Sequence, residues 1–367
     1  MAEQPRNLSW WQPEIGPAES QLVREVLESN YLNDGDVTER FEQEIAKRLG
    51  IHYAVAVTSG TVALYLSLMA LGIGPGDEVI VPDITFIATA NAVTMTGAKV
   101  VLADVCPDTF TIDPKSFEKA ITTKTKAVIP VHVSGRGGTV FEILDIAARK
   151  GIPVVEDAAE ALLSKCNGRF LGSLGVTGCF SFSPNKTITT GQGGMITTSD
   201  LKIHNRLREL KDQGRPVRGT GGDDIHASIG FNFKLTNLQA SVGLGQLTYL
   251  EARVERQKRI YEIYRDELQV IDGIHIFQFD TSGGEIPQWT DAIAEKRDEL
   301  DVHLSNHGAH CRRYWFPIHT QKPYRELDNR FPNSTRLAPK AIWLPSSFQM
   351  SDDDTQYVCK LIKQFYR

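Results

Sequence analysis

A lysine and an aspartate that each follow an apolar run have the greatest chemical potential in this chain of 367 residues. Lys186 lies between the apolar run 179–182 and the glycine-rich run 190–194, and Asp157 ends the apolar run 152–156. A lysine amine can form a Schiff base with an aldehyde, and an acid can keep a pyridine nitrogen protonated. The pair therefore indicates a site for pyridoxal 5'-phosphate (PLP). Lys186 would anchor the cofactor and, once released, move the substrate's proton.

Residues that could bind the phosphate follow another predicted strand. Ser59, Gly60 and Thr61 open a predicted helix, and a helix N-terminus offers unpaired N–H groups and a partial positive charge. Gly60 would let the backbone come close, while the two hydroxyl groups would add donors. Phe86, at the end of a further strand, could stack on the cofactor ring.

Each of these residues also has a simpler interpretation. Lysines usually face solvent, and Asp157 could merely cap the helix-like segment 158–161. Ser59 and Thr61 are equally suited to a plain N-cap, and Phe86 to the hydrophobic core. The cofactor hypothesis depends on all of them acting together.

The overall composition is that of an ordinary globular protein. Hydrophobic residues make up 41% of the chain and charged residues 23%, and the net charge of −5 provides no positive field for nucleic acid. Five cysteines without a CxxC pair argue against a disulfide framework or a zinc site. No apolar stretch reaches the roughly 18 residues of a membrane span, and the N-terminus shows no secretion signal. We therefore expect a cytoplasmic protein without a metal site.

Short runs rich in Val and Ile alternate with helix-like segments over the first half of the chain. Such runs are typical of strands buried on both faces, and the alternation indicates an α/β domain with a mainly parallel sheet flanked by helices. We predict seven strands, at residues 53–57, 78–81, 99–104, 126–133, 153–156, 178–182 and 194–198. Between them we predict helices at residues 62–71, 88–96, 114–120 and 140–149.

The two ends of the chain show a different pattern. Amphipathic helices are predicted at residues 18–28 and 37–49, and one long helix from residue 237 to about residue 268. The long helix would lead into a smaller α+β domain. Its elements would be strands near 274–279 and 288–293 and helices at 296–306 and 352–366. We expect a large domain at residues 1–250 and a small one at 251–367.

Seven segments in a fixed order carry a further signal. They are 57–64 (VTSGTVAL), 74–82 (GPGDEVIVP), 156–161 (EDAAEA), 180–186 (FSFSPNK), 193–196 (GGMI), 230–236 (GFNFKLT) and 316–319 (FPIH). In these segments the chain resembles the DegT-type nucleotide-sugar aminotransferases, in the aspartate aminotransferase (fold type I) superfamily of PLP enzymes. The resemblance runs through nearly the whole chain and implies the same fold.

The resemblance gives the cofactor residues specific roles. It implies that Lys186 carries the covalent link, that Asp157 pairs with the ring nitrogen and that Phe86 stacks on the ring. The residues implied to hold the phosphate are Gly60, Thr61 and Ser181. Asn232 would reach the phosphate from the other subunit, so that two chains of a homodimer would share each site.

The resemblance says less about the substrate pocket. Glu160 and His319 match positions near the sugar, although His319 could equally be a histidine of a surface loop. Four arginines are candidate contacts for a diphosphate or carboxylate, or serve only solubility: Arg215, Arg218, Arg312 and Arg313.

Several positions depart from the family pattern. Lys186 is retained where the dehydratase branch has histidine, which favours amino transfer over deoxygenation. Gln192 replaces a common glutamate, Lys234 replaces a common arginine, and segment 134–138 (SGRGG) replaces the usual aromatic–glycine segment. These changes leave the cofactor residues intact and bear on the substrate.

The leading hypothesis is an aminotransferase that moves an amino group from glutamate to a keto-sugar for polysaccharide, lipopolysaccharide or antibiotic synthesis. The favoured substrate is a 4-keto-6-deoxy nucleotide sugar. Alternatives are a 3-keto nucleotide sugar, a keto-cyclitol or an eight-carbon acidic keto-sugar. A hypothesis from another class is a PLP-binding regulatory protein without turnover.

Overall fold

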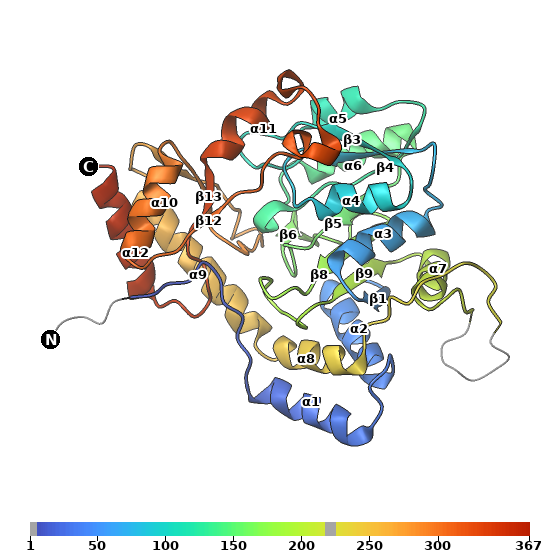
Figure 1. The fold of residues 1–367 in the computed structure, drawn as a ribbon. Coiled ribbons are helices and arrows are strands. Elements are labelled where there is room, and N and C mark those ends of the chain that lie inside the picture. The colour runs from blue at the N-terminus through green and yellow to red at the C-terminus, as the bar shows by residue number, and fades with distance from the viewer. Residues whose placement is uncertain (1–5, 217–224) are drawn as a thin grey trace.

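A central sheet of seven strands dominates the computed structural model, which describes residues 6–216 and 225–367 (Figure 1). The strands are β1 (Tyr53–Val57), β2 (Glu78–Pro82), β3 (Lys99–Ala103), β4 (Thr125–Val128), β5 (Val155–Asp157), β8 (Thr177–Ser181) and β9 (Gly194–Thr198). Strands β3-β2-β4 and β5-β8-β9-β1 form two hydrogen-bonded groups, and parallel bridges Val128–Val154 and Val131–Asp157 join them. Strand β9 is antiparallel to both of its neighbours, and the other pairings are parallel. The predicted α/β fold with a mainly parallel sheet is confirmed.

Helices cover both faces of this sheet, because successive side chains of a strand point to opposite faces. Val55 and Val57 of β1 pack in the core beneath α3, α4 and α7, whereas Ala54 and Ala56 pack with α2 and α8. The core on that second face continues under α5 and α6. The helices are α2 (Asp36–Leu49), α3 (Gly60–Ala70), α4 (Ala88–Met95), α5 (Pro114–Ala120), α6 (Val140–Lys150), α7 (Leu201–Lys211) and α8 (Asn237–Leu247).

The long helix predicted from residue 237 is wrong, because the chain turns at Thr248 and Tyr249. Helix α8 ends at Leu247, and α9 (Leu250–Leu268) starts in a new direction after Tyr249, whose ψ is 2°. Helix α8 packs against α1 (Pro17–Ser29) and α2. Gly243 lies so close to α2 that a Cβ there would come within 2.6 Å of the Phe41 ring. The turn lets α8 stay on this packing surface while α9 leaves it.

A second, antiparallel sheet follows α9. Its order is β10 (Ile274–Ile276), β11 (Asp291–Ala294), β13 (Ala341–Trp343) and β12 (Arg312–Arg313). Its core also takes residues from α9, α10 (Arg297–Asn306) and α12 (Asp352–Phe365). A short helix, α11 (Pro332–Leu337), precedes β13, and a small hairpin, β6 (Lys165–Cys166) with β7 (Arg169–Phe170), follows β5. The domain division near residue 250 stays a prediction.

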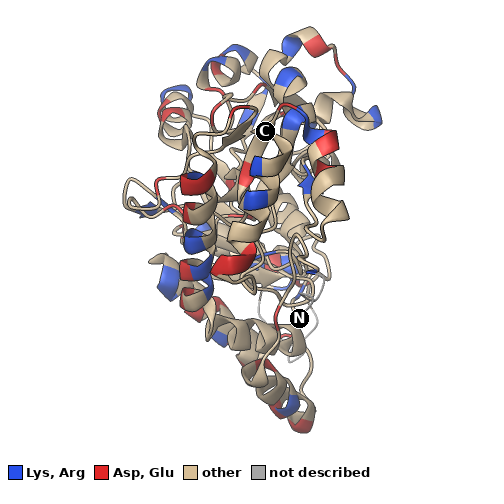
Figure 2. Cartoon of the chain, turned by 90° about the vertical axis from the view of Figure 1, so that its left-hand side faces the viewer, with Lys and Arg blue, Asp and Glu red and all other residues tan. Residues whose placement is uncertain are grey.

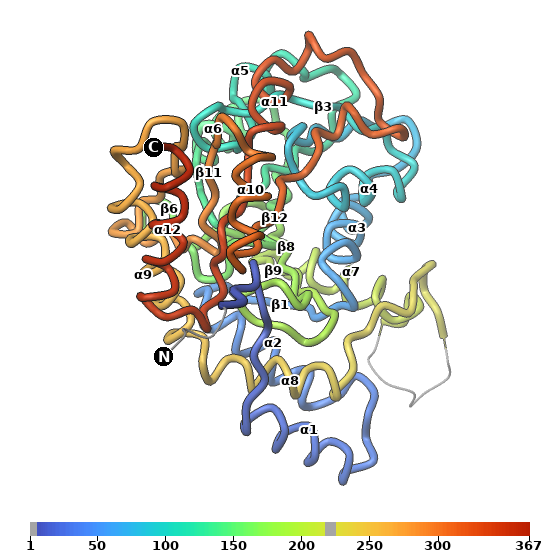
Figure 3. The backbone as a smooth tube through the Cα atoms, turned by 60° about the vertical axis from the view of Figure 1, so that its left-hand side comes forward, coloured from blue at the N-terminus to red at the C-terminus, as the bar shows by residue number. Residues whose placement is uncertain are grey.

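The N-terminal segment crosses to this second sheet before α1 begins (Figure 3). Leu8 forms a parallel bridge with Ala309, and the carbonyl oxygen of Trp10 accepts from Ser346 N–H at 3.1 Å. Residues from both ends of the chain therefore lie side by side.

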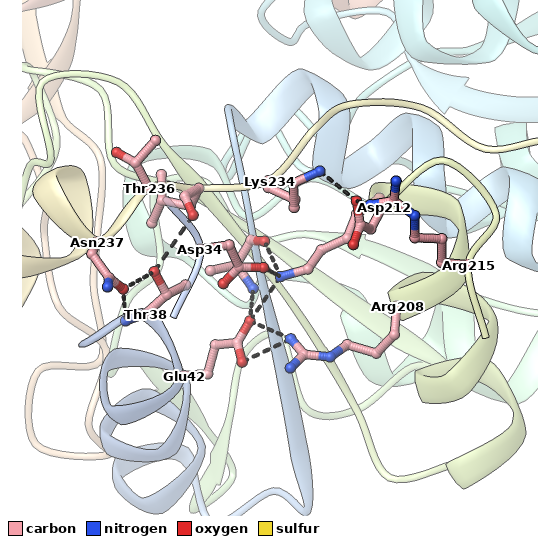
Figure 4. Close-up of polar contacts among 12 residues, drawn as sticks. Asp34, Thr38, Glu42, Arg208, Asp212, Arg215, Lys234, Thr236 and Asn237 are labelled. Atoms are coloured by element: carbon pink, nitrogen blue, oxygen red, sulfur yellow. Dashed lines mark hydrogen bonds and ion pairs between the residues drawn. The ribbon is translucent and has the colours of Figure 1, made fainter. Parts of the chain in front are cut away.

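A buried charge cluster joins α2, α7 and β1 (Figure 4). Lys211 of α7 is 2% exposed, and its Nζ lies 3.2 Å from Glu42 Oε1, 3.2 Å from Asp34 Oδ2 and 3.1 Å from the Ala56 carbonyl oxygen. Glu42 also accepts two hydrogen bonds from Arg208, at 2.7 and 2.9 Å. Burial would raise the pKa of Glu42, but Lys211 and Arg208 outweigh it and hold the pKa below its usual value.

Acidic and basic residues are interspersed along the helices on the side that Figure 2 presents. This agrees with the small net charge of −5. Among the described residues, no helix combines the length and the apolar character needed to cross a bilayer.

Candidate active site

A cavity of about 410 Å³ lies at the carboxyl ends of β5 and β8, beside the N-terminus of α3. Open α/β sheets place ligands at this edge. The predicted residues that line it are Ser59, Gly60, Thr61, Phe86, Asp157, Glu160, Ser181, Lys186 and Arg312. Folding thus gathers side chains that are distant in the sequence.

Lys186 projects into this cavity from the turn that follows β8. Its N–H donates to the Ser183 carbonyl oxygen at 3.0 Å, and its Nζ donates to Glu160 Oε1 at 3.2 Å. The Nζ also lies 4.8 Å from the centre of the Trp289 ring. The indole N–H of Trp11 holds the same turn by donating to the Pro184 carbonyl oxygen at 3.2 Å. The lysine is therefore fixed at its base while its amine faces the cavity.

Asp157 is the last residue of β5 and is 6% exposed. Its Oδ2 accepts from Thr89 Oγ1 at 2.8 Å, and its Oδ1 accepts from Ala159 N–H at 3.2 Å. Burial raises the pKa of Asp157 above its usual range, although Thr89, Ala159 and Lys186 act in the opposite direction. A cationic partner in the cavity would favour the ionised carboxylate.

Glu160 makes the direct contact with the lysine amine. Its Oε2 accepts from the Ser134 N–H at 2.8 Å, which leaves Oε1 to Lys186. Burial raises the pKa of Glu160, against the opposing effects of Lys186 and the Ser134 N–H. Two buried carboxyl groups thus interact electrostatically with one lysine.

The N-terminus of α3 meets the end of β8 in a close contact. Ser59 is the N-cap, and its Oγ accepts from the Val62 N–H at 3.2 Å. A Cβ on Gly60 would lie 2.9 Å from the Ser181 Cβ, so a side chain there would displace Ser181. The hydroxyl groups of Ser59, Thr61 and Ser181 surround the first turn, whose N–H groups have no partners within the helix.

Tryptophans form a further part of the cavity wall, which no motif in the sequence indicated. The chain has five tryptophans, and all of them pack together. Their ring centres are separated by 5.1 Å (Trp10 and Trp289), 6.3 Å (Trp11 and Trp289), 5.4 Å (Trp289 and Trp343) and 4.8 Å (Trp315 and Trp343). All but Trp11 line the cavity. The density of aromatic residues at 10–11 and 314–316 was the available signal.

Arg312 completes this wall beside the tryptophans. Its guanidinium lies 4.7 Å from the ring centre of Trp10 and 5.9 Å from that of Trp343. Arg313, in contrast, pairs with Asp298 and Asp301 outside the cavity, and Arg215 lies 3.7 Å from Asp212. Arg218 lies outside the described residues.

Two predicted site residues are not among those that line the cavity. His319 is 0% exposed, and its Nδ1 shares a hydrogen bond of 2.6 Å with Asp83 Oδ2 while its ring stacks on Phe331. Asn232 lies on the surface, where it forms a bridge with Asp212. The residue types alone predicted neither the burial of His319 against Asp83 nor the exposure of Asn232.

Thr85 and Thr89 are site residues that the sequence prediction missed. The two hydroxyl groups are 2.9 Å apart, and Thr89 continues the contact to Asp157. Their spacing of four residues, with Thr89 at the start of the helix predicted at residues 88–96 and Thr85 just before it, was the available signal. They hold the Asp157 carboxylate in place.

The residues present fit PLP. A lysine amine and a buried acid line the same cavity, and the glycine of the α3 N-terminus leaves room that a side chain would fill. The helix N-terminus suits a phosphate, and Phe86, 53% exposed, lines the space between them.

Comparison with known proteins places this chain in a family. Residues 13–363 match the DegT/DnrJ/EryC1/StrS aminotransferase family, to which the chain belongs. It is 36% identical to the GDP-perosamine synthase of Escherichia coli O157:H7 over 361 residues, which cover 97% of this chain and 98% of the relative. The aminotransferase TlmJ of Streptoalloteichus hindustanus matches with a TM-score of 0.92 and 31% identity over 98% of both chains. The PLP form of Spr1654 from Streptococcus pneumoniae matches with a TM-score of 0.92 and 27% identity, again over 98% of both chains.

These comparisons confirm three predictions. The chain is an aminotransferase, it has the fold of the PLP-dependent members, and its cofactor is PLP. The roles of the individual site residues are taken up as proposals below.

Proposed function

We propose that this aminotransferase transfers an amino group from glutamate to a keto-sugar carried on a nucleotide. One observation carries the proposal: a single cavity combines a lysine that interacts with two buried carboxyl groups with a wall of tryptophans and an arginine. The lysine and the carboxyl groups suit amino transfer, and the tryptophans and the arginine suit a sugar joined to an anionic group.

The cofactor side of the cavity is assigned to Lys186 and Asp157. When bound, PLP supplies an electron sink for the bonds broken at the substrate carbon. Lys186 holds the cofactor and later moves a proton with its freed amine. Asp157, held by Thr89, keeps the ring nitrogen protonated. Phe86 is assigned to stack on the face of the cofactor ring.

The phosphate of the cofactor is assigned to the first turn of α3. The N–H groups of this turn and the partial positive charge of the helix favour an anion. The side chains assigned to it are Ser59, Thr61 and Ser181. Gly60 permits the close approach of the backbone.

The substrate side is assigned to the tryptophans and Arg312. Indole rings present flat apolar surfaces to the C–H faces of a sugar, and a guanidinium binds a diphosphate with paired hydrogen bonds. Glu160 lies between this wall and Lys186 and is assigned to the substrate as well. The relative from E. coli is named for a GDP-linked product, which supports a GDP-linked substrate, and we favour a 4-keto-6-deoxy sugar.

The test is turnover with a panel of acceptors. The purified chain is incubated with PLP, glutamate and a keto-sugar, and 2-oxoglutarate and the amino product are measured by mass spectrometry. The panel contains GDP-, dTDP- and UDP-linked 4-keto-6-deoxy sugars, a 3-keto nucleotide sugar, a keto-cyclitol and an eight-carbon acidic keto-sugar. Glutamine replaces glutamate in a parallel series.

We expect the highest kcat/KM with the GDP-linked 4-keto-6-deoxy sugar. A preference for the acidic sugar would reassign Arg312 to a carboxylate. Absence of 2-oxoglutarate with every acceptor would contradict the proposal and favour the regulatory hypothesis.

We also propose a homodimer in which Asn232 completes the phosphate site of its partner. Asn232 is exposed and is not among the residues that line the cavity of its own chain, which supports a role toward a second copy. Exposed apolar side chains nearby, such as Ile225 and Ile229 (84% exposed), suit such a contact.

Subunit mixing tests the shared site. Lys186→Ala and Asn232→Ala proteins, each inactive or weakened alone, are unfolded, mixed and refolded together. We expect partial recovery, because one of the two sites in a hybrid dimer would have both residues. No recovery in a preparation shown to contain hybrid dimers would contradict a shared site.

The cysteines support a cytoplasmic location, which we include in the proposal. All five are described and none forms a disulfide. Free thiols persist in a reducing compartment. Fractionation of cells that express the tagged chain would test this.

A further inference from the structure

A buried ion pair lies behind the cavity, where the connection between β4 and α6 meets β11. The two Nη atoms of Arg136 donate to the two carboxylate oxygens of Asp291, each at 2.7 Å, and neither residue is more than 1% exposed. The guanidinium also lies 4.7 Å from the ring centres of Phe277 and Phe279. Removing one partner would leave the other charge buried without compensation, so breaking the pair would cost much stability.

Ser134 links this ion pair to the cavity wall. Its Oγ donates to Asp291 Oδ2 at 3.1 Å and accepts from the indole N–H of Trp343 at 3.0 Å. Its N–H donates to Glu160 Oε2 at 2.8 Å, and its carbonyl oxygen accepts from Gln288 N–H at 2.9 Å. All polar groups of this fully buried residue are therefore engaged.

The backbone of Ser134 has an unusual conformation. Its φ of 53° lies in the left-handed region, which a residue other than glycine adopts only when its surroundings compensate for the strain. The next residue, Gly135, has a φ of 100°, and a Cβ there would lie 2.1 Å from the Ile286 carbonyl oxygen. In this conformation one residue reaches Glu160 with its N–H and Asp291 with its side chain.

We infer that Ser134 is a positioning residue for amino transfer, which holds Glu160 and Trp343 in their orientations by tying both to the Arg136–Asp291 pair. Ser134 is not among the described residues that line the cavity, whereas Glu160 and Trp343 are. By engaging Oε2 of Glu160, it leaves Oε1 directed at Lys186 Nζ. The inference rests on the proposed role of Lys186 as the anchor of PLP.

A second buried serine, Ser164, lies beside the backbone of Gly135 and provides a matched control. Ser164 is also fully buried, donates to the Gly135 carbonyl oxygen at 2.6 Å and accepts from the Ile286 N–H at 3.0 Å. These two bonds involve neither the ion pair nor the cavity wall. Ser134→Ala and Ser164→Ala each remove one buried Oγ with two hydrogen bonds. The Oγ of Ser134 contacts the ion pair and the cavity wall, whereas the Oγ of Ser164 contacts only backbone groups.

The experiment compares these two variants in three measurements. The first is thermal unfolding. The second is the pH midpoint of the absorbance change of the PLP-loaded enzyme without substrate, and the third is kcat/KM for the half-reaction with glutamate, followed by the same absorbance. The midpoint responds to Asp157 and Glu160, which interact with Lys186, and to the charged or ionisable groups beside them: His132 near Asp157, Tyr314 near Glu160 and Arg312 in the cavity wall.

We expect both variants to melt at a similarly lowered temperature and only Ser134→Ala to change the other two measurements. The substitution keeps the Ser134 N–H but removes the Oγ contact to Asp291 that fixes it. Its midpoint shifts to lower pH, because a less firmly held Glu160 stabilises the protonated nitrogen of the lysine–cofactor link less. Its kcat/KM falls by about tenfold, on the scale of one hydrogen bond to a charged group.

Equal behaviour of the two variants in all three measurements would overturn the inference. If Ser134→Ala does not fold, Tyr314→Phe replaces it, because Tyr314 OH donates to Asp291 Oδ2 at 2.8 Å and its ring stacks on Trp343 at 3.9 Å. Phenylalanine keeps the stacking and loses the hydrogen bond, so we expect a smaller shift in the same direction. An unchanged midpoint would then overturn the inference. If Lys186→Ala retains the absorbance band, the proposed function itself fails.

Discussion

Lys211 and Lys186 are both withdrawn from solvent, but their surroundings differ. The Nζ of Lys211 lies within 3.2 Å of three oxygen atoms, from Glu42, Asp34 and Ala56. Within the described part of the chain, the Nζ of Lys186 forms one hydrogen bond, to Glu160 Oε1, and otherwise faces an indole ring and the cavity. An ammonium group has three donors. Lys211 uses all of them to hold the fold together, whereas Lys186 keeps capacity for a ligand.

The acids of the two regions show the same contrast. Two cations outweigh the burial of Glu42 and lower its pKa, whereas burial prevails at Asp157 and Glu160 and raises theirs. The acids and bases of the charge cluster compensate one another without any ligand. The cavity is an incomplete electrostatic arrangement, which a positively charged cofactor ring would complete.

The largest effect expected from this contrast is that of Lys186→Ala. Amino transfer should fall by about 10³-fold or more, because the proposed anchor and the proposed proton-moving amine are the same group. The absorbance band of the lysine-bound cofactor should disappear, while the free energy of unfolding changes by less than about 1 kcal/mol. Absorbance spectra and urea unfolding measure the two. A PLP adduct that borohydride still traps would identify another lysine as the anchor.

Asp157→Asn should have the next largest effect. An amide cannot stabilise a protonated ring nitrogen, so the rate should fall by about 10²-fold, the scale for losing one preorganised charge. Asp104→Asn is the control, since Asp104 is also a buried aspartate beyond a strand end and only accepts hydrogen bonds from Asn333 and Ser334. Steady-state rates should separate the two variants. Equal losses would mean that Asp157 is structural.

Lys211→Met should act on stability instead of on the reaction. Removing the ammonium leaves Asp34 and Glu42 buried with less compensation, at a cost of about 3 kcal/mol in the free energy of unfolding. Lys202→Met, an exposed position on the same helix, should cost less than about 0.5 kcal/mol. Urea unfolding measures both. A loss of rate in the folded Lys211→Met protein as large as that in Lys186→Ala would contradict the view that Lys211 serves only stability.

Glu42→Gln should show the smallest effect, and one that depends on pH. The pKa of Glu42 is lowered in the folded chain, so its ionised form contributes stability that is present above the unfolded pKa near 4.5 and is lost as the pH falls through the folded value. We expect Glu42→Gln to cost about 2 kcal/mol at pH 7.

The difference from the unmodified chain should narrow as the pH falls below about 4.5. Glu44→Gln, which alters a surface ion pair on the same helix, should cost less than about 0.5 kcal/mol at either pH. A cost for Glu42→Gln that is the same at both pH values would contradict the lowered pKa.

The central strands could be predicted because both faces of the sheet are covered, which makes their sequences continuously apolar. Helix α7 was missed for the opposite reason. Its sequence is largely polar, and its buried residues are Leu207, Leu210 and Lys211. A lysine counts as a surface residue until its partners are known, and those partners come from α2 and β1.

The lining of the cavity could be predicted where the residue type suggests the chemistry. Lys186 and Asp157 were expected together and line one cavity, while their roles stay predictions. Trp10 and Trp343 were not expected there, because their role follows from the path of the N-terminal segment across the second sheet. The same holds for His319, whose burial against Asp83 is a property of the folded chain.

The gathering of all five tryptophans has a practical consequence. Ultraviolet emission from a protein usually averages over indoles in unrelated places, but here every emitter lies in or beside the wall of one cavity. Binding of an absorbing cofactor or of a sugar should therefore quench or shift the entire signal. The intrinsic fluorescence of the unmodified chain is a reporter of what occupies its active site.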